Sequence, residues 1–217
     1  DFCLSRGLGD VYKRQTERSY AFLNVCWVRV TSAGRACVES ETDADARGEG
    51  KTVTTRLLLI ADTHVPKRAK RLPDAVLRAV DDADIVIHAG DWVDLATLDL
   101  LESRSRVLHG VYGNNDGHEL RERLPEIARF TVEQIDVAVV HETGQRQKRE
   151  ERMDVAFPGV DLLVFGHSHI PWDTVAPSGM RLVNPGSPTD RRRQPVCTMM
   201  SVSYTHLTLP TTTLCRS

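Results

Sequence analysis

Cysteine is absent from the middle of this chain. Residues 53–195 contain none, and the five cysteines lie nearer the two ends. They are Cys3, Cys26, Cys37, Cys197 and Cys215. This absence excludes a disulfide framework and a thiolate metal site from the middle of the chain. It also fits a reducing compartment, so we expect a cytoplasmic protein.

The chain also lacks a long apolar run and a strong excess of charge. No apolar stretch approaches the ~20 residues that a transmembrane helix needs, so we expect no membrane partner. The formal net charge of the 217 residues is −2, which gives no indication of nucleic acid as a partner. No internal repeat is present. The length is sufficient for one α/β domain with a sizeable core.

The two ends of the chain have an unusual relationship. Residues 10–15 and 202–207 can be encoded by inverted copies of one DNA sequence, which resembles the transposon adapters of sequencing libraries. We therefore expect an adapter-like, non-native and disordered leader at residues 1–52 and an adapter-like tail at residues 199–217. Between them, residues 53–198 would form the domain, truncated at its C-terminal end. This interpretation predicts that the flanks contribute little to the packed core.

Strand-like and helix-like segments alternate along the domain. Apolar runs predict strands at residues 56–60, 84–88, 106–111, 162–165, 174–175 and 181–183, and a hairpin within residues 130–140. Helical spacing predicts helices near residues 73–80, 95–101 and 116–123, and a charged, exposed helix at residues 145–157. Early β-α-β units followed by a β-rich half indicate an α/β fold with two packed β-sheets flanked by helices.

Four of the apolar runs end in polar strings. These are Asp62-Thr63-His64, Gly90-Asp91, Gly113-Asn114-Asn115-Asp116 and Gly166-His167-Ser168-His169. Strands that end in this way deliver their side chains to one edge of a sheet. Asp, Asn and His without Cys form a mixed oxygen and nitrogen ligand set, which suits Mn²⁺, Fe²⁺ or Zn²⁺. The candidates are too many for one closed site, whereas a pair of ions would use them all and catalyse displacement at phosphorus.

These strings resemble the motifs of the calcineurin-like metallophosphoesterases, especially the small bacterial and archaeal phosphodiesterase branch. The lone His141 and the string Asn184-Pro185-Gly186-Ser187 complete the pattern, which covers about residues 56–195. The resemblance implies a four-layer sandwich and two divalent metal ions, for which we expect manganese, with iron, zinc or nickel as alternatives. It implies that one ion is held by Asp62, His64, Asp91 and His169. It implies that the other is held by Asp91, Asn114, His141 and His167.

The resemblance also implies a reaction. The expected activity is hydrolysis of a small phosphodiester by a metal-bridging hydroxide, with Asp91, Asn114 and His167 as catalytic residues. Many relatives have a His after the motif Asn, where it protonates the leaving group. This chain has Asn115 there, which cannot donate a proton in that way and favours good leaving groups. The second departure is Glu142, which follows the lone His where Gly is usual.

Several alternatives stay open at this point. A retromer subunit shares the implied fold and serves as a non-catalytic scaffold, and a phosphomonoesterase would use the same ligands. Asp116 either caps the following helix or supports the site. The basic runs at residues 67–71 and 191–193 either contact phosphate or form solvated turns. His88 and His109 lie within strands and are expected to pack or to support the site from behind the ligands, and the sequence leaves homo-oligomerisation undecided.

Overall fold

The computed structural model describes residues 19–30 and 51–208. The elements follow this order: β1 (Ser19–Val30), β2 (Lys51–Ile60), α1 (Asp74–Asp82), β3 (Ile85–Ala89), α2 (Leu95–Arg104), β4 (Leu108–Val111), α3 (His118–Arg123), β5 (Ile127–Val132), β6 (Ile135–Val140), α4 (Arg149–Ala156), β7 (Leu162–Phe165), β8 (Trp172–Val175), β9 (Arg181–Asn184) and β10 (Cys197–Thr208). Among these residues, no helix combines the length and apolar character that crossing a membrane requires.

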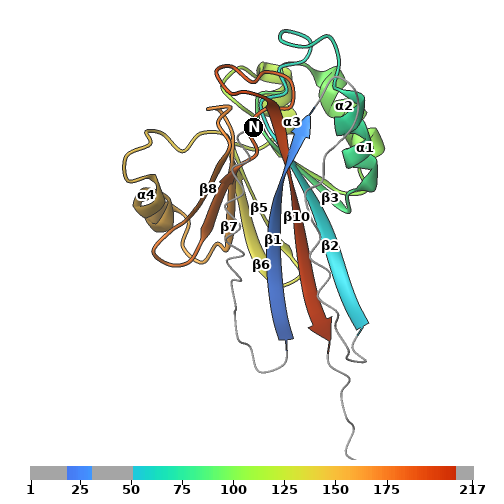
Figure 1. The fold of residues 1–217 in the computed structure, drawn as a ribbon. Coiled ribbons are helices and arrows are strands. Elements are labelled where there is room, and N and C mark those ends of the chain that lie inside the picture. The colour runs from blue at the N-terminus through green and yellow to red at the C-terminus, as the bar shows by residue number, and fades with distance from the viewer. Residues whose placement is uncertain (1–18, 31–50, 209–217) are drawn as a thin grey trace, which may run out of the picture.

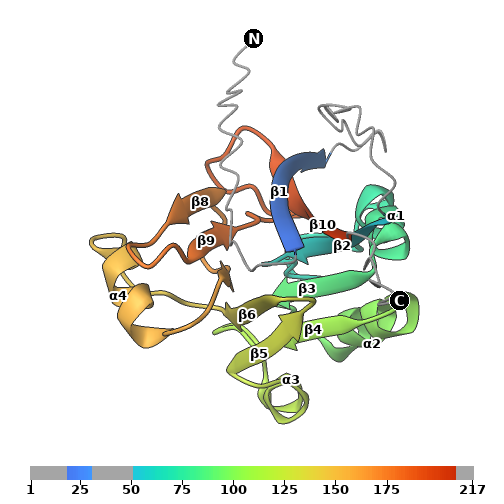
Figure 2. The same cartoon turned by 90° about the horizontal axis from the view of Figure 1, so that it is seen from below.

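The strands form two five-stranded sheets. One has the order β1-β10-β2-β3-β4, and the other has the order β5-β6-β7-β9-β8. Strands β2, β3 and β4 run parallel, as do β6, β7 and β9. Figures 1 and 2 show α1 and α2 beside the first sheet and α4 beside the second. The predicted α/β fold of two packed sheets flanked by helices is therefore confirmed.

Successive side chains of each strand point to opposite faces of its sheet and so belong to different hydrophobic clusters. Leu57 and Leu59 of β2 face the second sheet, where they pack with residues such as Val139 and Val164. Leu58 and Ile60 point the other way, into a cluster with α1 and α2. A third cluster lies between the outer face of the second sheet and α4. Each sheet is thus buried on both faces over its central strands, which explains the continuous apolar runs.

The structure corrects the predicted boundaries of the flanks. Strand β10 lies between β1 and β2, and its side chains Met200, Val202 and Tyr204 are buried. Alternate residues of one strand share a face, so these three lie on the side that packs against the second sheet. The expected exclusion of this segment from the core is therefore wrong. The adapter origin of the ends stays a prediction, and residues 1–18, 31–50 and 209–217 lie outside the described residues.

The predicted helix at residues 145–157 is shorter in the structure. It begins only at Arg149, because Gly144 and Lys148 have left-handed backbone conformations with φ of 69° and 50°. The preceding residues form a loop that leads from His141 to α4. Arg149 itself is buried rather than exposed.

Candidate metal centre

The predicted ligands follow the carboxyl ends of parallel strands. Asp62 follows β2, Asp91 follows β3, His141 follows β6 and His167 follows β7. Backbone hydrogen bonds join these strand ends: Asp62 N donates to the Gly90 oxygen at 2.9 Å, and Gly166 N donates to the His141 oxygen at 3.0 Å. The His167 amide also donates to Asp62 Oδ1 at 3.1 Å, which links the two sheets. The polar strings therefore meet where the carboxyl ends of the parallel strands of both sheets adjoin.

The backbone at these positions is left-handed. Asp62, His64, Asp91, His167 and His169 have φ between 44° and 67°. Residues other than glycine rarely adopt this region, and each such conformation costs on the order of 1 kcal/mol or more. Five strained residues at the adjoining strand ends of the two sheets indicate a site whose geometry is held by its surroundings.

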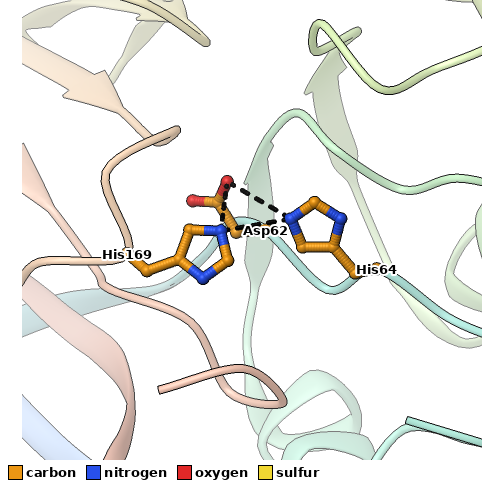
Figure 3. A group of neighbouring side chains, drawn as sticks. All are labelled: Asp62, His64 and His169. Atoms are coloured by element: carbon orange, nitrogen blue, oxygen red, sulfur yellow. Dashed lines mark hydrogen bonds and ion pairs between the residues drawn. The ribbon is translucent and has the colours of Figure 1, made fainter. Parts of the chain in front are cut away.

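The first cluster contains Asp62, His64 and His169 (Figure 3). The Nε2 atoms of the two imidazoles are 3.1 Å apart, and His169 Nε2 lies 3.3 Å from Asp62 Oδ1. All three residues are buried, and Asp62 Oδ2 has no hydrogen-bond partner. A buried carboxylate oxygen without a partner is costly unless something else neutralises it.

The second cluster contains Asp62, Asp91 and His141. Asp91 Oδ2 lies 3.4 Å from His141 Nε2 and also 3.4 Å from His64 Nε2 of the first cluster. Asn114 Oδ1 extends this cluster, since it lies 3.0 Å from His141 Nε2 and 2.9 Å from His167 Nδ1. One oxygen of Asp91 is thus placed between the two groups of candidate ligands.

Hydrogen bonds to the backbone determine which nitrogen of two histidines faces the centre. His141 Nδ1 lies 2.7 Å from the Ala89 carbonyl oxygen, and His169 Nδ1 lies 2.7 Å from the Asp190 carbonyl oxygen. A carbonyl oxygen only accepts, so Nδ1 carries the proton in both rings. The Nε2 atom of each ring then faces the carboxylates, which is the arrangement of metal-binding imidazoles.

The charges of the centre are strongly coupled. Burial raises the pKa of Asp91, but its contact with His141 and its hydrogen bonds from Asn115 outweigh burial and lower that pKa below its ordinary value. Burial lowers the pKa of His141, whereas Asp91 and Asp62 raise it, and the pKa is raised overall. For His64 burial dominates and the pKa is lowered despite the same two carboxylates. Asp91 is therefore an anion at neutral pH.

The residues present fit divalent cations. The donors are carboxylate, amide and imidazole atoms, a set that suits Mn²⁺, Fe²⁺ or Zn²⁺. Asp62 Oδ2 is buried without a partner, and the Nε2 atoms of His64 and His169 face one another. A cation between these atoms would accept the lone pairs of the Asp62 carboxylate and of both imidazoles. It would thereby offset the cost of burying these atoms close together without a donor.

Asp116 supports the centre and does not cap a helix. Its Oδ2 accepts hydrogen bonds from the amides of Asp91 (3.0 Å) and Gly113 (2.7 Å), and its Oδ1 accepts one from the Val93 amide (2.7 Å). Helix α3 has Gly117 as its N-cap, without a side-chain cap. Of the two roles that the sequence allowed for Asp116, only support of the site agrees with the structure.

The string that contains Asn184 and Ser187 also holds the ligand loops. Ser187 Oγ donates to the Asp62 carbonyl oxygen at 2.7 Å, and Asn184 Nδ2 donates to the Gly166 carbonyl oxygen at 2.7 Å. Thr189 Oγ1 adds a 2.6 Å bond to the Thr63 carbonyl oxygen. Sequence reasoning missed Thr189, and the only signal was its place just after the motif.

Two further histidines, His88 and His109, lie against aromatic rings as predicted. His88 stacks on Trp92 with the ring centroids 3.5 Å apart, and His109 stacks on Phe130 at 3.6 Å. Neither belongs to a candidate metal group among the described residues. His109 therefore serves packing, whereas His88 also supports the site, because its Nε2 lies 3.0 Å from Oγ1 of Thr63, the residue between the candidate ligands Asp62 and His64.

Residues 56–206 match the family described as the calcineurin-like phosphoesterase superfamily domain. A probable metallophosphoesterase from Methanothermobacter thermautotrophicus is 36% identical over 135 residues, which are 60% of this chain and 76% of the relative. Another, from Methanocaldococcus jannaschii, is 37% identical over 145 residues, which are 66% of this chain and 71% of the relative.

Solved structures with the same fold include two informative cases. The solution NMR structure of a Thermotoga maritima protein is 40% identical with a TM-score of 0.52, and the match covers 61% of this chain and 85% of that one. A single mutant of Vps29 from Entamoeba histolytica is 25% identical with a TM-score of 0.57, and the match covers 68% and 84%. The family match contains every residue of both clusters. This chain therefore belongs to the calcineurin-like phosphoesterase superfamily.

Proposed function

We propose that this protein is a dinuclear metal-dependent phosphodiesterase. The observation that carries the proposal is the place of Asp91 Oδ2, which lies 3.4 Å from an imidazole nitrogen of each cluster. A carboxylate in this position can bridge two cations. The seven ligands would be Asp62, His64, Asp91, Asn114, His141, His167 and His169. When bound, two divalent ions neutralise charge on a phosphate and make water acidic enough to act as a nucleophile at neutral pH.

The exposure of the ligands indicates where substrate would enter. The side chains of His64, Asp62, Asp91 and His169 are at most 7% exposed, whereas that of His167 is 47% exposed. Asn114 is also exposed. The centre is thus open on the side of Asn114 and His167. A phosphoryl group approaching from this side would meet these two residues first, which supports their place beside Asp91 among the proposed catalytic residues.

The residue after Asn114 favours diesters with good leaving groups. Asn115 directs its amide at Asp91, with Nδ2 donating to Oδ2 at 2.7 Å. An amide cannot protonate a departing alkoxide, and a positioned acid typically contributes ~10²–10⁴-fold to such a step. Aryl phosphodiesters, whose leaving group departs unprotonated, are therefore the expected best substrates. Alkyl monoesters are expected to react poorly.

The substitution Asp91→Asn tests the proposal. It keeps the size of the side chain but removes the charge that would offset two cations. We expect the metal content to fall from two ions per chain towards one or none, and turnover of an aryl phosphodiester to fall by orders of magnitude. Asp81→Asn is the matched control, because Asp81 is an exposed carboxylate on α1 that pairs with Arg104. Two bound ions and near-normal turnover in Asp91→Asn would refute the bridging role.

The similarity to Vps29 supports one alternative, a non-catalytic scaffold of the same fold. The two candidates differ in what the purified protein does. A scaffold would turn over neither diesters nor monoesters, and bound metal alone does not exclude it, because one matching Vps29 structure from Entamoeba histolytica is a complex with Zn²⁺. A phosphomonoesterase would bind the metals but reverse the expected substrate preference.

A further inference from the structure

Arg149 is a largely buried cation whose Nε lacks a hydrogen-bond partner. It is the first residue of α4, and only 8% of its surface is exposed. Its guanidinium carbon lies 4.9 Å from the centre of the Phe165 ring and 5.0 Å from the centre of the Trp172 ring. Its Nε has no hydrogen-bond partner, and no carboxylate of the described residues lies within ion-pair distance. Burying such a group is costly, so its position calls for a physical explanation.

Stacking on aromatic rings leaves the hydrogen-bonding groups of a guanidinium unused. The ring contacts involve the flat faces of the group, while its N–H donors point outward in its plane. Those donors match the oxygens of a phosphate, which they can bind two at a time. Phe165 and Trp172 therefore hold the guanidinium in place without satisfying it.

The surroundings add positive charge. Arg146 lies over the same Trp172 ring, 5.0 Å from its centre, and its side chain is exposed. Arg146 and Arg152 both act on Arg149 as like charges, and only Glu150 opposes them. Arg152 already donates to the carbonyl oxygens of Thr143 and Gln145. Among the described residues, the Nε donor of Arg149 stays available for an anion, which would share this place with the Glu150 carboxylate beside Trp172.

Three chain segments connect this group to the open side of the metal centre. Phe165 is two residues before His167, and Trp172 is three residues after His169. The loop that carries Arg146 starts beside His141, and its Glu142 contacts His167 Nδ1 at 3.2 Å. Short stretches of chain therefore join the arginines to His167.

We propose that Arg149 and Arg146, placed by Trp172, bind a second phosphate group of the substrate, separate from the phosphodiester that is cleaved. The site would make the enzyme selective for diesters that carry a further phosphate, such as phosphorylated nucleotides. This assignment to a substrate rests on the proposed phosphodiesterase function. Binding of phosphate by the arginines does not depend on it.

The first experiment measures binding without catalysis. The full chain is treated with a chelator and titrated with inorganic phosphate while tryptophan emission is recorded, because Trp172 lies in the site and reports its occupation. We expect the tryptophan emission to change with phosphate concentration and to reach a plateau. We expect Arg149→Met and Arg146→Met each to weaken binding by roughly tenfold or more, as the loss of charge-assisted hydrogen bonds predicts. Arg149→Lys keeps the charge but not the paired donors, so it should restore binding only in part.

The matched control is Arg129→Met. Arg129 also lies over an aromatic ring, 5.1 Å from the centre of Phe157, but it is exposed on β5. Circular dichroism of each variant shows whether it is folded, and Arg146→Met tests the site even where the buried Arg149→Met is unstable. No saturable change in the wild type, or equal losses in Arg129→Met and Arg146→Met, would overturn the proposed site. A stronger response to acetate than to phosphate would overturn its assignment to phosphate.

The second experiment uses the metal-loaded enzyme. It compares kcat/KM for the p-nitrophenyl ester of thymidine 5′-phosphate with that for the same ester carrying a 3′-phosphate. We expect the wild type to prefer the doubly phosphorylated ester, and Arg146→Met to lose this preference while keeping its rate on the simple ester. Equal rates of the wild type on both esters would overturn the link to substrate. If neither ester is hydrolysed but phosphate still binds, the phosphodiesterase function fails and the arginine site stands.

Discussion

Asn115 donates a hydrogen bond to each carboxylate oxygen of Asp91. Its backbone amide lies 2.9 Å from Oδ1, and its side-chain Nδ2 lies 2.7 Å from Oδ2. The pair fixes the orientation of the carboxylate that lies between the two clusters, and it helps to lower the pKa of Asp91. Asn115 thus acts as a positioning residue at the place where many relatives have an acid.

Removing this amide should weaken metal binding. Asn115→Ala deletes the bond to Oδ2 but keeps the backbone bond to Oδ1, so Asp91 loses orientation without losing charge. Residues that orient metal ligands typically contribute ~10–100-fold to affinity, and we expect a loss in this range. Calorimetric titration of the metal-free protein with Mn²⁺ measures it. An unchanged affinity would show that the backbone bond alone positions Asp91.

Replacing the same residue by histidine should change the preference for leaving groups. Asn115→His introduces an imidazole with an ordinary pKa of about 6.5, which nearby cations lower further. We expect a selective gain on alkyl esters at mildly acidic pH and little gain on aryl diesters, because only alkoxides need the proton. Rates on both ester classes across pH 5.5–8 provide the check. An equal change on both classes argues against proton donation at this position.

Alanine substitutions at two glycines of one loop should differ strongly in their effects on metal binding and stability. A Cβ on Gly113 would lie 2.2 Å from Asp91 Oδ1, whereas a Cβ on Gly117 would meet nothing within 4 Å. Gly113→Ala must therefore displace Asp91, and we expect loss of metal binding together with a lower melting temperature. Gly117→Ala should leave both nearly unchanged. Thermal unfolding with and without Mn²⁺ separates these outcomes, and a tolerated Gly113→Ala would mean that the loop adapts.

The strand-end motifs made the clustering of the candidate ligands predictable from sequence. Parallel strands carry Asp62 and Asp91 to one edge of the first sheet, so their proximity follows from topology once the strands are recognised, whereas His167 comes from the second sheet. The support of the ligands could not be read in the same way. Thr189 contacts the Thr63 backbone across 126 positions of sequence, and nothing in the local pattern indicates such a partner.

The arginine beside Trp172 shows a different limit of sequence reasoning. The charged segment around Arg149 predicts an exposed helix, because charge is normally solvated. In the structure the guanidinium is buried between two rings that come from β7 and β8. The charge pattern of the segment around α4 carries no information about aromatic side chains that come from β7 and β8.

His88 should make the stability of the metal-free protein depend on pH. Burial lowers its pKa well below the ordinary value of 6.5, so the folded ring stays neutral. As the pH falls below about 6.5, the unfolded chain takes up a proton that the folded chain does not, and stability decreases by up to ~1.4 kcal/mol per pH unit. In His88→Gln, the free energy of unfolding should fall less steeply as the pH decreases. Denaturant unfolding between pH 7.5 and 5 measures how the free energy of unfolding depends on pH in the wild type and in the variant. Equal dependences would show that His88 does not cause the loss of stability.

Tyr204 should be important for stability although it lies in the segment whose sequence resembles an adapter. It is 1% exposed, and it pairs with Leu23 of β1 and Thr55 of β2 across the sheet. Replacing a fully buried aromatic side chain by alanine removes apolar contacts and leaves a cavity, so we expect Tyr204→Ala to cost roughly 3 kcal/mol or more. Ser203→Ala is the matched control, because the neighbouring residue of the strand points to the opposite face. It should change the free energy of unfolding by no more than ~0.5 kcal/mol.

Denaturant unfolding of both variants shows whether this segment is part of the core or a foreign tail that the fold does not need. A strong effect of Tyr204→Ala means that the strand belongs to the core whatever the origin of its codons. Equal, negligible effects of both variants would mean that the fold is complete without β10 beyond residue 200, as a foreign tail requires.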